Sequence, residues 1–291
     1  MTRRWTACVA MEAALILGPL VSVGMTQDLL LESAQMGTAG RFGGTSVTIS
    51  QFVGWRFETS EPLAVERVGG HLLSFPDEPG DIFAALVRLD SLTSVPHGAP
   101  FTAEEVVAAT LFRPNFPSDE ILTPMSATLV PGSYVLVFGT GLFGATGAGA
   151  LHNGPDQPDI PPTDLSSFIF WSIPFFGRPP EWRLNLASHM RFVIEAQVIH
   201  IPGDYNGDFH VDSLDYDVWK SDFGSTTVLD ADGNGNEVVD AADYTIWRDN
   251  FGASLGSGAA ATVPEPAGLP LMLIAVIMSL CLPTPLSDRR R

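Results

Sequence analysis

An acidic stretch toward the C-terminal end of the chain occurs twice in register, and this repeat constrains the fold more than any other feature. The segment from Asp204 to Gly224 recurs 28 residues further on, from Asp232 to Gly252. Each copy has acidic and amide residues first, then a tyrosine, a tryptophan and a closing Phe-Gly pair in the same relative places. Self-similarity at a fixed spacing indicates that each copy folds as one supersecondary unit.

Side chains with oxygen atoms fall at positions 1, 3, 5, 9 and 12 of a twelve-residue loop in each copy, which is the ligand spacing of a calcium loop. The first loop has Asp204, Asn206, Asp208, Asp212 and Asp215, and the second has Asp232, Asn234, Asn236, Asp240 and Asp243. Calcium takes about six to eight oxygen ligands, and position 7 adds a main-chain carbonyl, from His210 or Val238. The sequence therefore predicts two calcium ions. We also expect the apolar residues at position 8, Val211 and Val239, to let the loops pair back to back.

A helix is predicted after each loop, over Tyr216 to Phe223 and over Tyr244 to Phe251. In each helix the tyrosine, tryptophan and phenylalanine lie at i, i+3 and i+7, on one face. Gly224 and Gly252 follow directly, as expected of glycines that end helices. A module of this size has few other apolar side chains to bury, so we interpret the aromatic residues as core rather than as a ligand platform.

A calcium loop followed by one helix, given twice, resembles the type I dockerin repeat. The resemblance covers residues 201–252 and includes the aspartate at position 12 of each loop, Asp215 and Asp243. It implies a small α-helical module that binds two calcium ions and docks onto a cohesin-like protein partner, in a setting where polysaccharides are degraded.

The repeat departs from this pattern at three places. Position 6, where a calcium loop needs glycine for a sharp turn, is Phe209 or Glu237, and a left-handed backbone there costs about 1 to 2 kcal/mol. Position 5 of the second loop is the neutral Asn236, so we expect the first loop to bind calcium more tightly. Positions 10 and 11, a Ser-Thr pair for cohesin recognition in many dockerins, are Ser213-Leu214 and Ala241-Ala242.

The region before the repeat has the pattern of a mainly β domain. Short runs of alternating or β-branched residues are separated by glycine and proline, which suggests a β-sandwich or jelly roll over residues 26–200. Pro131-Gly132 is interpreted as a hairpin turn. Residues 101–110 fit either a short helix or a strand. The expected strands are Ser46 to Phe57, Ala64 to Leu73, Ile82 to Leu89, Ser126 to Val130, Ser133 to Phe138, Phe168 to Ile173 and Arg191 to Ile199.

Both ends of the chain have the pattern of sorting signals. Arg3 and Arg4 precede an apolar run and small residues, which predicts a secretory signal peptide over residues 1–25. At the other end, Val263-Pro264-Glu265-Pro266, the apolar run 269–282 and the closing arginines resemble the PEP-CTERM sorting signal, over residues 263–291. That resemblance implies processing by an exosortase-type enzyme, a transient membrane segment, and display on the outer cell surface or in the extracellular matrix. Residues 253–262 are predicted to be a flexible linker.

The β region also resembles a β-sandwich domain found in exported PEP-CTERM proteins. The residues that carry this likeness are Gly69-Gly70-His71-Leu72 and the stretch from Pro131 to Gly139. The likeness supports the fold more than any activity.

Charge and cysteine content exclude several classes of function. The formal net charge is −18, with Lys220 the only lysine, so the chain lacks the clustered cations that nucleic acid binding requires. The two cysteines, Cys8 and Cys281, lie in the end segments. A chain processed at both ends would have neither disulfides nor cysteine-ligated zinc.

Four weaker signals do not change this interpretation. Gly139 to Gly144 has the GxGxxG pattern, but the helix of a dinucleotide fold does not follow. The adjacent acids Glu104-Glu105 and Asp119-Glu120 are interpreted as turn residues. Trp171 and Trp182 are interpreted as core rather than as platforms for sugar rings. The histidines His71, His97, His152 and His189 show no metal-ligand spacing.

The sequence thus predicts an exported, non-catalytic binding protein with a β-sandwich domain and a dockerin-like calcium module. Two alternatives remain: a polysaccharide-degrading hydrolase or lyase that docks through its dockerin, and a glycan-binding protein.

Overall fold

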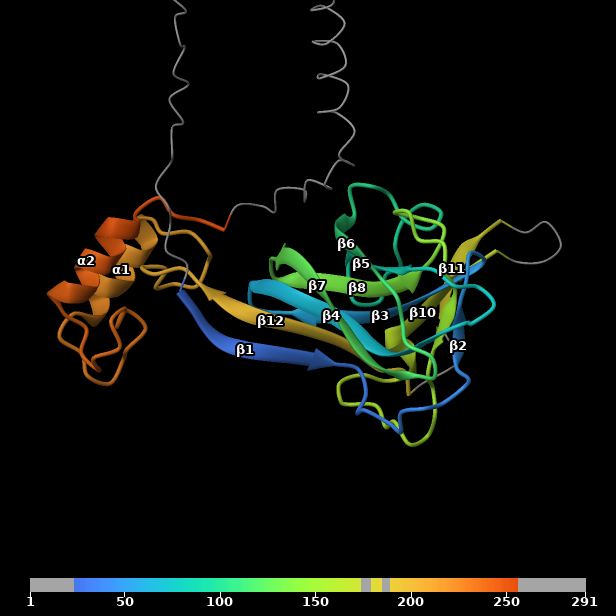
Figure 1. Ribbon diagram of the computed structural model, residues 1–291. Coiled ribbons are helices and arrows are strands. Elements are labelled where there is room, and N and C mark those ends of the chain that lie inside the picture. The colour runs from blue at the N-terminus through green and yellow to red at the C-terminus, as the bar shows by residue number, and fades with distance from the viewer. Residues whose placement is uncertain (1–23, 174–178, 185–188, 256–291) are drawn as a thin grey trace, which may run out of the picture. The chain divides into compact units, whose positions relative to one another are not determined.

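Figure 1 shows the computed structural model of the chain, which describes residues 24–173, 179–184 and 189–255. Within these residues the chain forms two compact units, one of residues 28–197 and one of residues 198–255 together with 24–27. Residues 1–23 of the predicted signal peptide, 256–262 of the predicted linker and all of the predicted sorting signal lie outside the described residues. None of the described helices is long and apolar enough to cross a membrane.

Two antiparallel sheets of six strands each make up the mainly β part of the chain (Figure 1). The first sheet has the order β1-β12-β4-β9-β2, with β7 also paired to β4. Its strands are β1 (Gly24–Glu32), β2 (Thr45–Val47), β4 (Leu63–Ser74), β7 (Asp119–Leu129), β9 (Gly149–Leu151) and β12 (Phe192–His200).

The second sheet has the order β11-β10-β3-β8-β5-β6. Its strands are β3 (Gln51–Thr59), β5 (Ile82–Leu89), β6 (Val106–Phe112), β8 (Gly132–Gly139), β10 (Phe168–Ser172) and β11 (Glu181–Leu184). A short 3-10 helix, η1 (Leu165–Ser167), leads into β10. The prediction of a mainly β domain is confirmed.

Aromatic side chains join the two sheets in the core. Phe138 of β8 stacks on Phe192 of β12 with ring centroids 5.0 Å apart, and Trp55 of β3 lies 6.3 Å from the same ring. The opposite face of the second sheet is buried as well, in a cluster that includes Trp171 and Trp182. Because both faces are covered, β8 is a nearly continuous apolar run rather than an alternating one. The core interpretation of the two tryptophans is confirmed.

Two glycines in the middle of β4 let neighbouring main chains approach closely. A Cβ atom on Gly69 would stand 1.8 Å from the carbonyl oxygen of Ile121 in β7, and one on Gly70 would stand 2.1 Å from that of Arg191. Only glycine fits such close approach. The Gly69-Gly70 pair of the sequence motif is therefore needed by the sheet itself.

The predicted turn at Pro131-Gly132 is wrong, and the alternative left open for residues 101–110 is decided. Pro131 and Gly132 do not form a hairpin turn, because β7 pairs in the first sheet and β8 in the second. They instead carry the chain from one sheet to the other. Residues 106–112 form strand β6 rather than a helix. Thr102 and Glu105 do bond, with Thr102 N to Glu105 Oε2 at 2.8 Å, but they close a turn before the strand.

The strands that the sequence did not predict are β1, β9, β11 and the first half of β7. The strand expected over Ser46 to Phe57 is divided into β2 and β3 by a turn in which Thr48 and Gln51 exchange main-chain hydrogen bonds. Short strands such as β2 and β9, three residues each, offer too few residues for an alternating pattern to be recognised.

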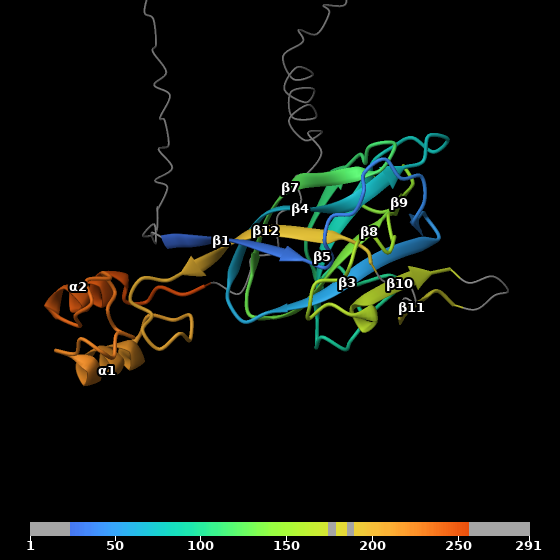
Figure 2. The same ribbon diagram turned by 90° about the horizontal axis from the view of Figure 1, so that it is seen from below.

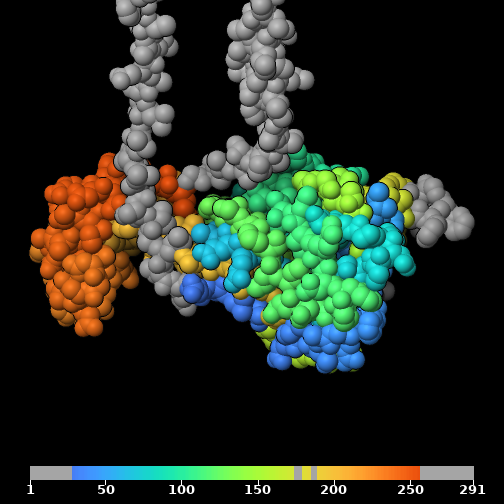
Figure 3. Space-filling model, in the orientation of Figure 1, coloured from blue at the N-terminus to red at the C-terminus, as the bar shows by residue number. Residues whose placement is uncertain are grey.

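The unit of residues 198–255 holds the acidic repeat. Helix α1 (Ser213–Asp222) follows the first loop and α2 (Ala241–Asn250) follows the second, as predicted. Figure 2 shows the two helices as separate short rods, and Figure 3 shows their atoms, in orange and red, as a closely packed body. Gly224 and Gly252 follow the helices with φ of 87° and 88°, which confirms their role at the helix ends.

Candidate metal centre

Each predicted loop is fastened to the helix that follows it by the residues at positions 9 and 12. Asp212 caps α1 by accepting a hydrogen bond from Leu214 N at 2.7 Å, while Asp215 accepts one from Asp212 N at 2.7 Å. Asp240 and Asp243 make the same reciprocal pair at α2. This capping box explains why the helices begin where they do, and it fixes two predicted ligands in each loop.

The aspartate at position 1 folds the first half of each loop around its carboxylate. Asp204 accepts hydrogen bonds from the main-chain N–H of Gly207 at 2.9 Å and of Phe209 at 2.9 Å. Asp232 accepts from Asn236 at 3.1 Å and from Glu237 at 2.7 Å. Aspartate favours such local bonds to the following main chain. The two loops therefore share one main-chain path despite their different sequences.

Position 6 has the left-handed backbone that the sharp turn of a calcium loop requires. Phe209 has φ of 68° and Glu237 has φ of 66°, and both are among only four such non-glycine residues in the described chain. The conformation is unfavourable for residues with a Cβ atom. The hydrogen bonds that Asp204 and Asp232 accept from these same N–H groups stabilise it locally.

Several oxygen atoms of the loops are free to bind a cation. The carbonyl oxygens at position 7, of His210 and Val238, accept no hydrogen bond from any described residue. The same holds for one carboxylate oxygen of Asp212 and one of Asp240. Hard oxygen donors of this kind are the ligands that calcium prefers.

The carboxylates at position 12 are buried, and those at position 1 are half-buried. Asp215 and Asp243 are both 0% exposed. Burial raises the pKa of Asp204; hydrogen bonds from Phe209 and Gly207 act against this, and the negative charges of Asp215 and Asp208 add to it. The negative charges of Asp215 and Asp208 act on Asp204, and a calcium ion would supply the compensating positive charge.

No three His, Cys, Asp or Glu side chains come together as a metal-ligand group anywhere in the described chain. The loop oxygens point partly at main-chain N–H groups, as described above. A calcium loop draws many of its ligands from amide and main-chain oxygens, and carboxylates without a cation between them repel. The residues present therefore fit calcium by donor type and loop path, and coordination remains a prediction.

The residues at position 8 do not pair the two loops with each other. Val211 N donates to the carbonyl of Ala253 and Val211 O accepts from Gly252, both at 2.8 Å. Val239 makes the corresponding bonds to Ser225 and Gly224. The predicted back-to-back pairing is wrong, because each position-8 residue pairs with the segment that follows the helix of the other copy. The folded unit consequently extends to Leu255, past the predicted boundary at Gly252.

A tryptophan on each helix connects that helix to the loop of the other copy. Trp219 on α1 donates its indole N–H to the carbonyl of Asp240 at 2.8 Å, and Trp247 on α2 donates to the carbonyl of Asp212 at 2.7 Å. The two bonds are equivalent under the repeat. They satisfy the carbonyl at the start of each helix and tie position 9 of one loop to the other copy.

The tyrosines and tryptophans pack together between the two helices, whereas each phenylalanine ring packs against the tryptophan of its own helix. Ring centroids of Tyr216 and Trp247 lie 5.2 Å apart, and those of Trp219 and Tyr244 lie 5.1 Å apart. Phe223 and Phe251 are 56% and 59% exposed. The tyrosines and tryptophans are half-buried, so the core interpretation is confirmed only in part for these four rings. It is wrong for the two phenylalanines, which are exposed at the helix ends.

The glycine-rich motif, the histidines and the adjacent acids, which the sequence did not connect to a function, have structural roles. Gly139 to Gly144 forms the end of β8 and a turn. His71 is fully buried and bonds Gln157 at 2.6 Å and Ser118 at 2.8 Å. Glu105 accepts hydrogen bonds from Thr102 within its turn, whereas Glu120, interpreted as a turn residue, instead pairs with the buried Arg191 at 2.6 Å.

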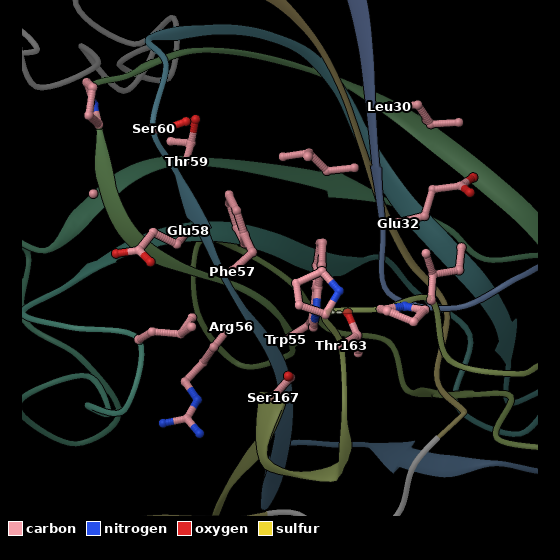
Figure 4. A pocket seen from close by; sticks show the side chains of 17 residues that line it. Leu30, Glu32, Trp55, Arg56, Phe57, Glu58, Thr59, Ser60, Thr163 and Ser167 are labelled. Carbon is pink, nitrogen blue, oxygen red and sulfur yellow. Dashed lines mark hydrogen bonds between the residues drawn. The ribbon is translucent and has the colours of Figure 1, made fainter.

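A pocket of about 950 Å³ in the β unit was not predicted from the sequence. It lies beside the end of β3, between Trp55 and Phe57 on that strand and Leu30 and Glu32 on β1 (Figure 4). The residues that line it come from places far apart in the chain, so no local pattern could have indicated it.

No protein-family model matches the sequence, and comparison with curated proteins finds no significant match. The likenesses to dockerin repeats and to the PEP-CTERM signal therefore stay predictions from the residues that carry them.

Proposed function

We propose that the chain is an exported, non-catalytic binding protein whose residues 201–252 form a dockerin-like module that binds two calcium ions. The module would connect the β-sandwich domain to a protein partner of the cohesin type. The PEP-CTERM-like end would bring the protein to the outer cell surface or the extracellular matrix.

The observation that carries the proposal is the shared main-chain path of the two loops. Both have a left-handed residue at position 6, a position-1 aspartate that bonds the turn, and an uncommitted carbonyl at position 7. A calcium loop has a sharp turn at position 6, and both loops keep this turn although neither residue there is glycine. The hydrogen bonds from the position-6 N–H groups to Asp204 and Asp232 hold the turn in both loops, which supports the proposed calcium geometry.

Calcium titration of the full chain by calorimetry tests the proposal. We expect two ions to bind, with a gain in helical circular dichroism and a higher melting temperature, because a ligand that binds only the folded state stabilises it. Replacing Asp204 and Asp232 together by alanine is expected to abolish both effects. Asp217→Asn, a change of an exposed acid on α1 outside the loops, is the matched control.

Absence of calcium heat and of any calcium-dependent stabilisation in the wild-type chain would refute the calcium proposal. The partner is tested separately, by comparing proteins captured by the immobilised chain with calcium and with chelator. A partner bound equally in both conditions would show that docking does not depend on calcium. The proposal that the loops bind calcium would not be affected by this result.

A further inference from the structure

Strand β3 has a neighbouring strand on only one side over its last four residues. Strand β10 pairs with β3 from Gln51 to Trp55, whereas β8 pairs with it from Val53 to Thr59. Among the described residues, the segment 56–59 therefore has β8 on one side and no strand on the other. The pocket described above lies along this open edge.

The direction of the free main-chain groups follows from the antiparallel ladder. Ile173 N donates to Ser50 O at 3.0 Å in line with the β10 pairing, so the even-numbered residues of β3 direct their N–H and C=O groups toward β10. By the same alternation, the main-chain groups of Arg56 and Glu58 point into the open edge. No described residue outside the β8 ladder bonds to them.

The two faces of this strand end differ in chemistry. Trp55 and Phe57 lie on the side toward β1, where Leu30 faces them across the pocket, and Arg56 and Glu58 leave the strand on the other side (Figure 4). Ile160 and Pro161 also line the pocket. A strand added here would set alternate side chains against apolar walls and against Glu58.

Glu58 is an exposed carboxylate without a cationic partner in the described part of the chain. Its only hydrogen bond there is from the hydroxyl of Ser133, at 3.2 Å. The neighbouring Arg56 is buried and donates to the carbonyl oxygens of Ser94 and Ser166. A lysine or arginine opposite Glu58 would form a cross-strand ion pair, and the net charge of −18 favours a basic partner in general.

We propose that this pocket binds an extended peptide segment of another protein as an added strand antiparallel to β3. The peptide bonds to the main chain of Arg56 and Glu58, sets apolar side chains against Trp55 and Phe57, and places a lysine or arginine opposite Glu58. Strand addition suits an edge of this kind because the free N–H and C=O groups supply affinity and the alternating side chains supply specificity.

The test uses the full chain and a capped hexapeptide of alternating lysine and valine with a fluorescent label. We expect saturable binding by fluorescence anisotropy, and slower hydrogen exchange at the amides of Arg56 and Glu58 when the peptide is present. In the proposed register the lysines face Glu58, so their main-chain groups bond to β3. Methylating the main-chain amide nitrogens of the lysine residues should weaken binding about tenfold or more. Methylating the main-chain amide nitrogens of the valine residues should not weaken it.

Charge reversal provides the matched protein variants. Glu58→Lys is expected to weaken the lysine peptide about two- to fivefold and to favour a peptide of alternating glutamate and valine. Glu66→Lys makes the same charge change on β4, outside the pocket, and should leave both affinities unchanged.

Equal binding of the two methylated peptides would overturn the proposal, because it would show that the main-chain edge is not used. Protection of amides elsewhere without protection at Arg56 and Glu58 would do the same. Slow exchange of these two amides in the full chain before peptide is added, reversed when residues 256–291 are removed, would identify a segment of this chain as the occupant and also overturn it.

Discussion

The hydroxyl of Tyr205, at position 2 of the first loop, donates a hydrogen bond to the main-chain carbonyl of Asp243, at position 12 of the second loop, over 2.7 Å. The equivalent residue of the second loop is Gly233, where a Cβ atom would stand 2.6 Å from the Tyr205 hydroxyl. The repeat is therefore symmetric in its tryptophans and asymmetric here. The Tyr205 side chain of the first loop extends to the second loop, where the absence of a side chain at Gly233 leaves space for it.

Tyr205→Phe should destabilise the unit of residues 198–255 by about 1 kcal/mol, because it removes the hydrogen bond from the Tyr205 hydroxyl to the Asp243 carbonyl. We expect calcium affinity to fall at the second loop more than at the first, although the changed residue lies in the first. Thermal melts and two-site calorimetry measure the two effects. Tyr216→Phe is the control, since its hydroxyl has no hydrogen bond to a described residue. Equal losses from both variants would contradict the role of the bond.

Glu237→Gly should stabilise the second loop by up to about 1 kcal/mol, since glycine adopts the left-handed backbone without a Cβ penalty and its greater unfolded-state entropy offsets only part of the gain. Phe209→Gly should destabilise instead, because Phe209 packs against Ile201, Val211 and Ala253. Chemical denaturation of both variants measures the difference. A gain from Phe209→Gly would show that strain outweighs packing at that position.

Asn236→Asp should raise the calcium affinity of the second loop several-fold, by giving position 5 the charge that Asp208 has in the first loop. The exchange fits the loop, because Asn236 Oδ1 accepts from Val238 N at 2.9 Å much as Asp208 Oδ1 accepts from His210 N at 3.0 Å. Asp208→Asn should lower the affinity of the first loop in the same titration. Unchanged affinities would mean that position 5 does not bind the ion.

Stability of the β unit should fall as pH drops below about 6.5, because burial lowers the pKa of His71 from that ordinary value. His71 stays neutral in the fold while the unfolded chain takes up a proton, so its contribution is fully present above pH 6.5 and is lost below it. Urea denaturation between pH 5 and 8 measures this slope. His71→Gln should flatten it, because glutamine takes up no proton in this pH range.

The His71 contacts show why such a network escapes sequence analysis. Gln157 donates through Nε2 to the carbonyls of His152 and His189, so its Oε1 accepts from His71 Nδ1–H, and His71 Nε2 then accepts from the Ser118 hydroxyl. The partners lie 47 and 86 residues away from His71. Long-range hydrogen bonds of this kind leave no periodic trace in the sequence.

Local chemistry alone determined the repeat, the two helices with their glycine ends, the left-handed backbone at position 6 and the mainly β character of the described residues before the repeat. Those features depend on contacts between residues that are only a few positions apart. At this range the spacing in the sequence determines the distance between the side chains.

Only the tertiary structure decided which strands share a sheet, that Val211 pairs with the tail of the second copy rather than with Val239, and that β3 ends with an open edge. These features depend on segments distant in the sequence meeting at one place. There, main-chain groups bond to whichever partner the packing of the whole unit brings within reach.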